Sequence, residues 1–250
     1  MKTDNPFLLH SFDDDVFALY SIKRLDFRRD KNNNSGFTNA YNLLCDFVLD
    51  RCSFSIREKG LFFPEQVHGN KVVNIKPKDC SAKRVNGLLY ILPGSDGLIT
   101  SLANTAIAVL SADCLPIFIY DAVNKAVGII HAGWKGTHLN IAQYAVEAMV
   151  KEFKSDPKML KVLFGPSIRS CCYRIDKDRA ALFQGHVHSK DAEYFLDIAS
   201  ANISRLKQKG VPEDSFTDCN ICTSCDNKDF FSYRREGGNC GRMISLIFRK

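Results

Sequence analysis

Three uninterrupted apolar runs follow one another in the middle of the chain, and they constrain its fold more than any other feature. They are Thr105–Leu110, Leu115–Tyr120 and Ala126–Ile130. Apolar runs of this length are typical of strands that are buried on both faces. The period then changes, because Ala142, Ala145 and Met149 fall on one face of a helix predicted over Asn140–Phe153. Buried strands followed by an amphipathic helix predict a domain that mixes helices and strands.

The remaining segments fit the same domain. Short apolar or alternating runs predict strands in residues 1–20, on both sides of a break at His68 within Leu61–Ile75, and at Lys161–Phe164, Cys171–Ile175, Phe230–Arg234 and Met243–Phe248. Helical spacing predicts helices over Tyr41–Ile56 and Asp197–Lys209. Because the sequence shows no internal repeat and no linker, we expect a single domain over residues 1–250.

The composition argues against several classes of protein. Lysine and arginine exceed aspartate and glutamate by 34 to 28, which gives a net charge of +6 without any basic block, so nucleic-acid binding is not expected. No apolar run approaches the roughly 18 residues of a membrane helix, and no signal peptide opens the chain. We therefore expect a cytoplasmic protein with no membrane partner. Its 10 cysteines are then metal ligands, catalytic thiols or buried side chains rather than disulfides.

Two histidines and one cysteine are each placed at a strand end or a sharp turn. Cys114 stands directly before one apolar run, His131 ends another, and His68 lies at a bend between two strands. Thiolate and imidazole are ligands of tetrahedral zinc, and a catalytic site keeps its fourth position for water or substrate. The same residues also suit a Cys114 nucleophile with His131 as its base, or a buried cysteine beside two hydrogen-bonded histidines. The pattern alone leaves these three interpretations open.

Several charged residues are candidates for substrate binding or proton transfer. The turn that contains Lys135 stands between a strand and a helix, where backbone N–H groups favour an anion. Arg234, Arg235 and Arg242 flank a glycine-rich turn near the end of the chain. They either bind an anionic substrate, cover a sheet edge or are surface charges. Asp113, next to Cys114, is a candidate to move a proton or only to orient a ligand.

The remaining cysteines suggest a second metal site. Cys219, Cys222 and Cys225 are spaced by two residues, and Cys240 would complete four ligands, although the spacing lacks the usual paired knuckles. Cys171 and Cys172 are adjacent in a predicted strand, so their side chains are expected to point to opposite faces, one toward the core and one toward the site.

Six short stretches together resemble one known family. They are Gln66–Gly69, Asp96–Thr100, Ala112–Pro116, His131–Gly136, Gly165–Ile168 with Cys171–Tyr173, and Phe230–Arg235 with Gly241–Arg242. Over about residues 60–250 the chain is similar to the laccase-domain family, long labelled multicopper polyphenol oxidase. Members of that family are now described as purine nucleoside phosphorylases with adenosine deaminase activity. The chain departs from the family pattern at Arg169, where the family has glycine, and at Glu236, where it has aspartate.

The resemblance implies a fold, a metal and a reaction. The fold is a single α+β domain with mixed β-sheets flanked by helices, and it is related to the toxin-type Cys/His deamidases. The metal is taken to be zinc, with copper as the alternative, and its ligands are His68, Cys114 and His131. The implied reactions are the phosphorolysis of adenosine, inosine and S-methyl-5′-thioadenosine, and the hydrolytic deamination of adenosine. The expected partners are therefore a small nucleoside and phosphate, and we expect a monomer or a homodimer.

Two other functions remain open at this point. Copper-dependent polyphenol oxidation, as in a laccase, needs several histidine-rich copper sites, whereas this chain has only 6 histidines. A Cys/His hydrolase would use Cys114 and His131 without a metal. A non-catalytic binding module is a further class, but no sequence feature favours it.

Overall fold

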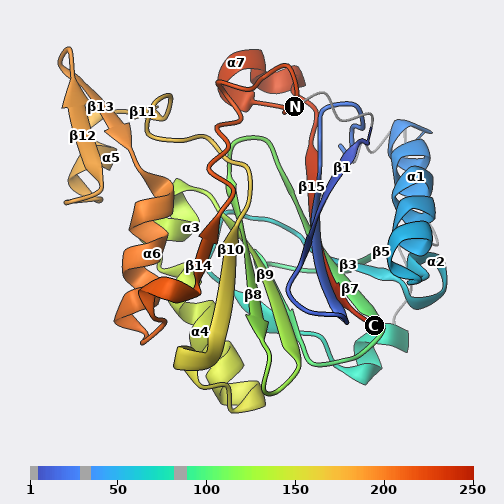
Figure 1. The fold of residues 1–250 in the computed structure, drawn as a ribbon. Helices are drawn as coiled ribbons and strands as arrows, with labels where there is room; N and C mark the ends of the chain where they lie inside the picture. The colour runs from blue at the N-terminus through green and yellow to red at the C-terminus, as the bar shows by residue number, and fades with distance from the viewer. Residues whose placement is uncertain (1–4, 29–34, 82–88) are drawn as a thin grey trace.

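The computed structural model describes residues 5–28, 35–81 and 89–250, and they form four layers. Two six-stranded sheets lie face to face in the middle. Figure 1 shows helix α1 (Ser35–Cys52) outside one sheet, and helices α4 (Ile141–Phe153) and α6 (Ile198–Gln208) outside the other. The α+β fold with mixed sheets and flanking helices is therefore confirmed.

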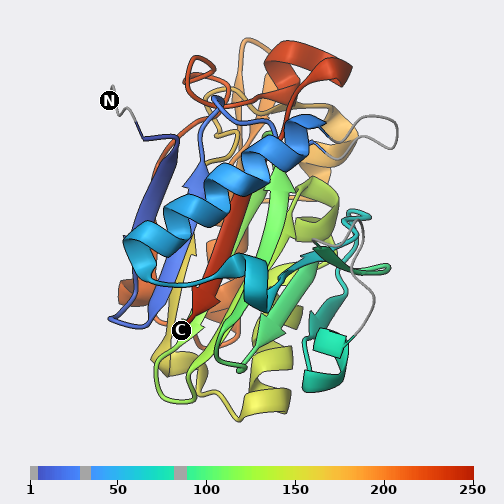
Figure 2. The same cartoon turned by 90° about the vertical axis from the view of Figure 1, so that its right-hand side faces the viewer.

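The first sheet has the order β1-β2-β15-β7-β3-β5 and combines antiparallel and parallel pairs. Its strands are β1 (Phe7–Ser11), β2 (Val16–Ser21), β3 (Leu61–Pro64), β5 (Leu89–Leu92), β7 (Thr105–Ser111) and β15 (Met243–Arg249). Helix α1 crosses its outer face in Figure 2, followed by the short helix α2 (Ile56–Lys59). Leu44 and Val48 of α1 are buried against Leu246 and Phe248 of β15, which fixes this helix on the sheet.

The second sheet has the order β14-β10-β8-β9-β6-β4. Its strands are β4 (Val72–Asn74), β6 (Gly97–Thr100), β8 (Leu115–Asp121), β9 (Ala126–Ala132), β10 (Leu160–Phe164) and β14 (Phe216–Asp218). Ala142, Ala145 and Met149 of α4 are buried in one cluster with Ile117 and Ile130 of this sheet. The apolar face predicted for this helix is therefore the face that covers the sheet.

The two sheets share an apolar core of their own. Phe62, Val109 and Ile247 of the first sheet are buried in one cluster with Phe118 and Ile129 of the second. Every residue of β7, β8 and β9 is buried, because each strand faces a helix layer or pocket on one side and the other sheet on the opposite side. The uninterrupted apolar runs of the sequence are explained by this double burial.

A smaller three-stranded sheet projects from the body of the fold (Figure 1). It contains β11 (Arg174–Ile175), β12 (Val187–Lys190) and β13 (Glu193–Leu196), with helix α5 (Lys177–Ala181) beside it. Two further helices are short. Helix α3 (Trp134–His138) follows β9, and helix α7 (Tyr233–Glu236) follows the long loop after β14. Within the described residues no helix is long and apolar enough to span a membrane.

Three expectations from the sequence were wrong in detail. Residues Phe230–Arg234 are not a strand, because Phe230 and Phe231 pack into a small cluster with Ile22 and Met243 while the chain turns into α7. The first long helix begins at Ser35 rather than at Tyr41. Cys171 and Cys172 lie in a turn before β11 rather than in a strand, so the strand rule for opposite faces does not apply to them.

Candidate active site

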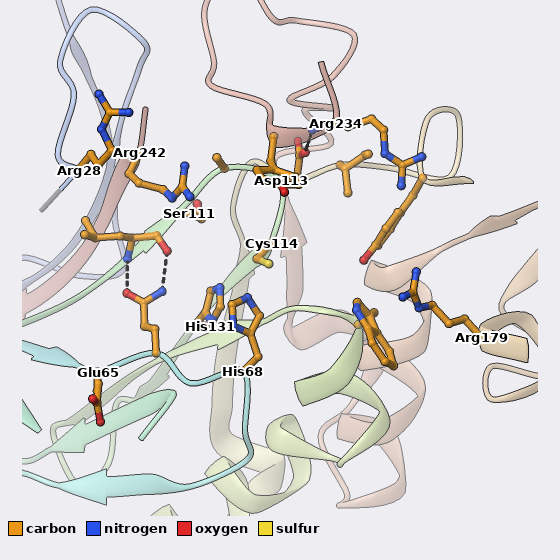
Figure 3. A pocket seen from close by; sticks show the side chains of 17 residues that line it. Arg28, Glu65, His68, Ser111, Asp113, Cys114, His131, Arg179, Arg234 and Arg242 are labelled. Carbon is orange, nitrogen blue, oxygen red and sulfur yellow. Dashed lines mark hydrogen bonds between the residues drawn. The ribbon is translucent and has the colours of Figure 1, made fainter. Parts of the chain in front are cut away.

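The ends of several strands meet at one edge of the two sheets, and the predicted metal ligands lie there. Cys114 directly precedes β8, and His131 is the last residue but one of β9. His68 reaches the same edge from the loop between β3 and β4, which belong to different sheets. This loop passes over the open edge of the sandwich, so residues far apart in the sequence meet. Figure 3 shows the three side chains directed toward one another.

The three side chains are close enough to share one ion. One ligand atom from each of His68, Cys114 and His131 lies within 4.8 Å of the others. The two imidazole rings have their centroids 4.9 Å apart and stand at 76° to one another, so they do not stack. His131 is 3% exposed, Cys114 is half-buried and His68 is exposed. The His131 side of the cluster is thus fixed in the core, and the His68 side faces a pocket.

Cys114 and His131 shift each other's pKa toward the charged forms, thiolate and imidazolium. Burial acts to raise the pKa of the Cys114 thiol, but the neighbouring His131 and His68 rings outweigh it and lower this pKa to about 6. Burial acts to lower the pKa of His131, but Cys114 and Asp96 outweigh it and raise this pKa to about 9. Cys114 is therefore available as a thiolate, the form that binds a metal or attacks a carbon.

Asp96 positions two of the three side chains, and the sequence analysis gave it no role. One carboxylate oxygen accepts hydrogen bonds from the backbone N–H of His68 at 2.9 Å and lies 3.0 Å from His131 Nδ1. The other oxygen accepts from the backbone N–H groups of Val67 at 3.1 Å and Gly69 at 2.7 Å. With Nδ1 bonded to Asp96, the other ring nitrogen of His131 is left for a metal, as in carboxylate–histidine–zinc sites. The detectable signal was an acidic residue directly before a buried strand.

Burial and hydrogen bonding act in opposite directions on Asp96. Burial acts to raise the pKa of this carboxyl, but the hydrogen bonds from His131, Gly69 and His68 outweigh it and hold the pKa below its usual value. Asp96 is fully buried, so its negative charge depends on these hydrogen bonds and on the one from the backbone N–H of Val67.

Two glycines allow the surrounding backbone to approach the cluster. A Cβ atom at Gly133 would lie 3.0 Å from Cys114 Sγ and 3.3 Å from His68 Cδ2. A Cβ atom at Gly136 would lie 2.9 Å from the carbonyl oxygen of Gly69. The glycine-rich turn predicted as an anion site therefore has a packing role as well, because it lets helix α3 lie against the His68 loop.

A cavity with a volume of about 660 Å³ opens above the cluster. This volume is typical of a small-molecule site. Its charged lining residues are Arg28, Arg179, Arg234 and Arg242, against Glu65 and Asp113 (Figure 3). The excess of arginine makes the cavity attractive to an anion. The aromatic side chains Trp134, Tyr173 and Tyr233 also line it. The guanidinium of Arg179 lies 4.8 Å from the centre of the Trp134 ring, which orients both groups.

Of the three residues predicted to bind an anion, Arg234 lines the cavity, whereas Lys135 and Arg235 do not. Arg234 lines the cavity, with its guanidinium 5.8 Å from the centre of the Tyr173 ring. Lys135 is exposed on α3 and is not among the cavity-lining residues. Arg235 is not a lining residue either, because its Nε donates to the backbone oxygen of Ser224 at 3.1 Å. Arg179 was missed, because the sequence gives no sign that α5 lies beside the cavity.

Asp113 lines the cavity, but both of its oxygens have partners. One accepts from the hydroxyl of Thr223 at 2.7 Å, and the other accepts from the backbone N–H of Arg234 at 2.7 Å. Asp113 has a φ of +91°, outside the usual range of L-residues, and is almost fully buried. Its contacts hold the Arg234 segment against the edge of the sheets.

The second metal site predicted from Cys219, Cys222, Cys225 and Cys240 is wrong in two of its four residues. Cys240 is fully buried beside Phe230 and Met243, and Cys219 lies 3.9 Å from a guanidinium nitrogen of Arg169. The sulfurs that meet Cys222 and Cys225 are instead those of Cys171 and Cys172.

The two departures from the family pattern form ion pairs. The Arg169 guanidinium makes two contacts of 2.7 Å with the carboxylate of Asp218. Glu236 accepts from Lys23 at 3.0 Å and from the backbone N–H of Ser232 at 3.1 Å. Neither Arg169 nor Glu236 lines the cavity.

The low pKa of Cys114 predicts unusual thiol reactivity in chelator-treated protein. Because the pKa lies at about 6, alkylation of Cys114 by iodoacetamide should already be near its plateau at neutral pH and half-maximal at about pH 6. An ordinary cysteine, with a pKa of about 8.5, would still gain reactivity above neutral pH. Mass spectrometry of the labelled peptide across a pH series measures this.

The matched control is His131→Asn, which removes the cation that contributes most to lowering the pKa. Its Cys114 profile should move toward that of an ordinary thiol. Identical profiles in the two proteins would show that His131 does not lower this pKa.

Comparison with known proteins places these features in a family context. Residues 48–250 match the family described as multi-copper polyphenol oxidoreductase laccase. A purine nucleoside phosphorylase of Clostridium acetobutylicum is 30% identical over 245 residues, covering 96% of this chain and 94% of the relative. Purine nucleoside phosphorylase YlmD of Bacillus subtilis is 32% identical over 196 residues, covering 75% of this chain and 70% of the relative.

Some relatives are much longer than this chain. Purine nucleoside phosphorylase LACC1 of Mus musculus is 37% identical over 162 residues, which are 61% of this chain but only 37% of the mouse protein. Solved structures match over nearly the full length. Bacillus licheniformis YfiH has a TM-score of 0.87 at 28% identity, covering 99% of this chain and 98% of that one. YlmD from Geobacillus stearothermophilus has the same TM-score at 25% identity, covering 100% and 98%.

Proposed function

This chain belongs to the family described as multi-copper polyphenol oxidoreductase laccases, and from its relatives and its site we propose that it is a zinc-dependent purine nucleoside phosphorylase that also deaminates adenosine. The observation that carries the proposal is the arrangement of one Cys/His cluster at the base of a cavity lined by four arginines. A metal beside an anion site suits the cleavage of a nucleoside by phosphate.

The ligand set fits zinc. Two imidazoles and one thiolate leave a fourth tetrahedral position open, and the carboxylate of Asp96 supports His131 from behind. When bound, zinc supplies Lewis-acid chemistry, which polarises a ligand oxygen or nitrogen and makes a water easier to deprotonate. His68, Cys114 and His131 hold the ion in this proposal.

The arginines are suited to hold phosphate. Arg234 and Arg242 enter the cavity from the C-terminal segment, and Arg28 enters from the loop after β2. A guanidinium presents a planar set of donors that matches phosphate oxygens. In phosphorolysis a phosphate oxygen bonds to C1′ of the sugar while the bond from C1′ to the base nitrogen breaks. The cations hold the attacking oxygen and offset its charge.

The aromatic side chains are suited to hold the base. Trp134 and Tyr173 are half-buried, and Tyr233 is exposed at the rim. A purine stacks on such rings regardless of its exocyclic group, which is consistent with adenosine, inosine and S-methyl-5′-thioadenosine as substrates. In this proposal Asp113 is a positioning residue for Arg234, because both of its oxygens already accept hydrogen bonds.

The test is to separate phosphorolysis from deamination by product. Purified protein is incubated with adenosine, with and without phosphate, and adenine, inosine, hypoxanthine and ribose 1-phosphate are measured. We expect adenine and ribose 1-phosphate only with phosphate, and inosine in both conditions, with Cys114→Ala defining the background. Absence of ribose 1-phosphate above this background would overturn the phosphorylase, and absence of inosine would overturn the deaminase.

Arg242→Ala should weaken phosphate use more than nucleoside use. Loss of one charge-assisted hydrogen bond costs about 1.5–3 kcal/mol, or about 10- to 100-fold in kcat/KM for phosphate. Initial rates at varied phosphate and at varied adenosine measure the two effects. Lys161→Ala is the matched control, because Lys161 is exposed on β10 and is not a cavity-lining residue. An equal rise in both KM values would show that Arg242 is not a phosphate residue.

Polyphenol oxidation, the activity in the family's older description, has less support from this site. The 6 histidines include only two, His68 and His131, in the potential metal clusters of the described residues. His10, His138, His186 and His188 lie apart from them, each beside an aromatic ring or a serine. Several copper atoms per chain on elemental analysis would favour the oxidase instead.

A further inference from the structure

A second group of sulfurs lies outside the candidate active site. It consists of Cys171 and Cys172, in the turn before β11, and Cys222 and Cys225, in the loop after β14. The four sulfurs all lie within 4.8 Å of one another. Cys225 Sγ is 3.5 Å from Cys171 Sγ and 3.4 Å from Cys172 Sγ. These separations are far longer than a disulfide bond of about 2.05 Å, so the structure holds four free thiols.

The spacing of the sulfurs matches a metal site. In a zinc site with four thiolates at about 2.3 Å from the ion, tetrahedral geometry puts neighbouring sulfurs about 3.8 Å apart. The separations of 3.4 Å and 3.5 Å lie just below that value, and no two of the four sulfurs are more than 4.8 Å apart. Four thiols without an ion gain little from such an approach, because S–H is a weak donor and sulfur a weak acceptor.

The backbone holds the four sulfurs in place before any ion binds. The N–H of Asp226 donates to the Cys222 carbonyl at 2.9 Å, which closes the turn between Cys222 and Cys225. The N–H of Cys172 donates to the carbonyl of Arg169 at 2.9 Å, which fixes the other turn.

The two cysteine-bearing segments are also joined directly. Ser167 and Cys222 form an isolated parallel bridge, and the N–H of Thr223 donates to the Ser167 carbonyl at 3.0 Å. Arg169 Nε donates to the carbonyl of Ile221 at 3.3 Å. The ligands therefore come from two loops that already lie side by side. Cys222 is buried, whereas Cys171 and Cys225 are exposed, so an ion has a path from solvent.

We propose that Cys171, Cys172, Cys222 and Cys225 bind one zinc ion in a closed structural site that is separate from the His68 cluster. Four protein ligands leave no open position, which is typical of structural zinc. Binding releases the thiol protons to solvent and replaces four weak contacts by four metal–sulfur bonds. This proposal does not rest on the proposed reaction, because none of the four cysteines lines the cavity.

The ion would fasten one wall of the active-site cavity. Tyr173 directly follows Cys172 and lines the cavity. Thr223 directly follows Cys222 and donates to Asp113, which in turn holds the backbone of Arg234. Loss of the ion should therefore loosen both the aromatic wall and the Arg234 segment.

The experiment measures zinc in protein that lacks the first cluster. Zinc per chain is determined by elemental analysis in Cys114→Ala, alone and combined with Cys225→Ser. We expect one equivalent in the single variant and almost none in the double variant. Cys225 is exposed, so its replacement should leave the fold intact. The matched control adds Cys219→Ser, a neighbouring cysteine outside the group of four, and should keep one equivalent. Equal zinc in all three proteins would overturn the proposal.

A second measurement does not depend on any cysteine variant of the group folding correctly. Cobalt added to chelator-treated Cys114→Ala should produce the intense sulfur-to-metal charge-transfer absorption of a tetrathiolate site, and added zinc should abolish it. Thiols are also counted in the denatured, metal-free wild type. We expect all 10 cysteines to react. A count lower by two, without cobalt absorption, would identify a disulfide among the four and overturn the zinc site.

Discussion

Asp96→Asn is expected to lower the affinity of the His68–Cys114–His131 cluster for a metal ion by about 100-fold and to destabilise the fold at the same time. The carboxylate accepts three backbone N–H groups and contacts His131 Nδ1. An asparagine replaces one acceptor oxygen by an NH₂ group, which faces two of these donors and cannot accept from them. Two charge-assisted hydrogen bonds at about 1.5–3 kcal/mol each give a loss of about 3–6 kcal/mol in the free energy of unfolding.

The two effects can be separated with a variant of Asp121, which lies at the end of β8 opposite to Cys114. Asp121 is also fully buried, and its carboxylate accepts from the backbone N–H groups of Val123 and Asn124 and from the Asn124 side chain. Asp121→Asn should also lose stability but keep its metal affinity. Urea unfolding gives the first quantity, and competition with a chromophoric chelator gives the second. Metal affinity that falls equally in both variants would mean that Asp96 acts only through stability.

The layers of the fold were predictable because the pattern of apolar residues indicates which segments are buried. The runs that became β7, β8 and β9 are apolar at almost every position, and only a strand covered on both faces explains this. Their partners were not predictable in the same way. The stretches on either side of His68 look like one broken hairpin, yet β3 and β4 belong to different sheets. Hydrophobicity reports that a strand is buried but not which neighbour it pairs with.

The candidate site was predicted as a set of residue types rather than as a geometry. His68 lies far from Cys114 in the sequence, so their meeting depends on a loop that crosses the sandwich edge, and no local pattern records it. The cysteines show the same limit. Strand periodicity separated Cys171 from Cys172, but in a turn both sulfurs approach Cys225. The cysteine spacing instead predicted Cys219 and Cys240, rather than Cys171 and Cys172, as partners of Cys222 and Cys225. Cys219 and Cys240 belong to the same segment of the sequence as Cys222.

Gly133→Val should fold normally and lose about 100-fold in activity. Gly133 has φ −77° and ψ 174°, an extended conformation that valine adopts without strain. Its added Cβ, however, would meet Cys114 Sγ at 3.0 Å and His68 Cδ2 at 3.3 Å, and its methyl groups would extend further. The His68 side chain is exposed and can move away, so the fold survives while the three ligands no longer converge. A displacement of about 1 Å in a reacting group is enough for a loss of this size.

The series Gly133→Ala and Gly133→Val makes this steric explanation quantitative. The alanine adds only the Cβ, so its loss of metal affinity and of activity should lie between those of the wild type and the valine variant. Gly238→Val is the matched control, since a Cβ there has no atom within 4 Å and Gly238 lies outside the cavity lining. Turnover of adenosine, metal content and thermal unfolding are measured for each protein. If Gly133→Val kept full metal content and activity, the close approach of the backbone at residue 133 would not be needed for the site. If it lost activity only together with its melting transition, the glycine would be required for folding rather than for ligand placement.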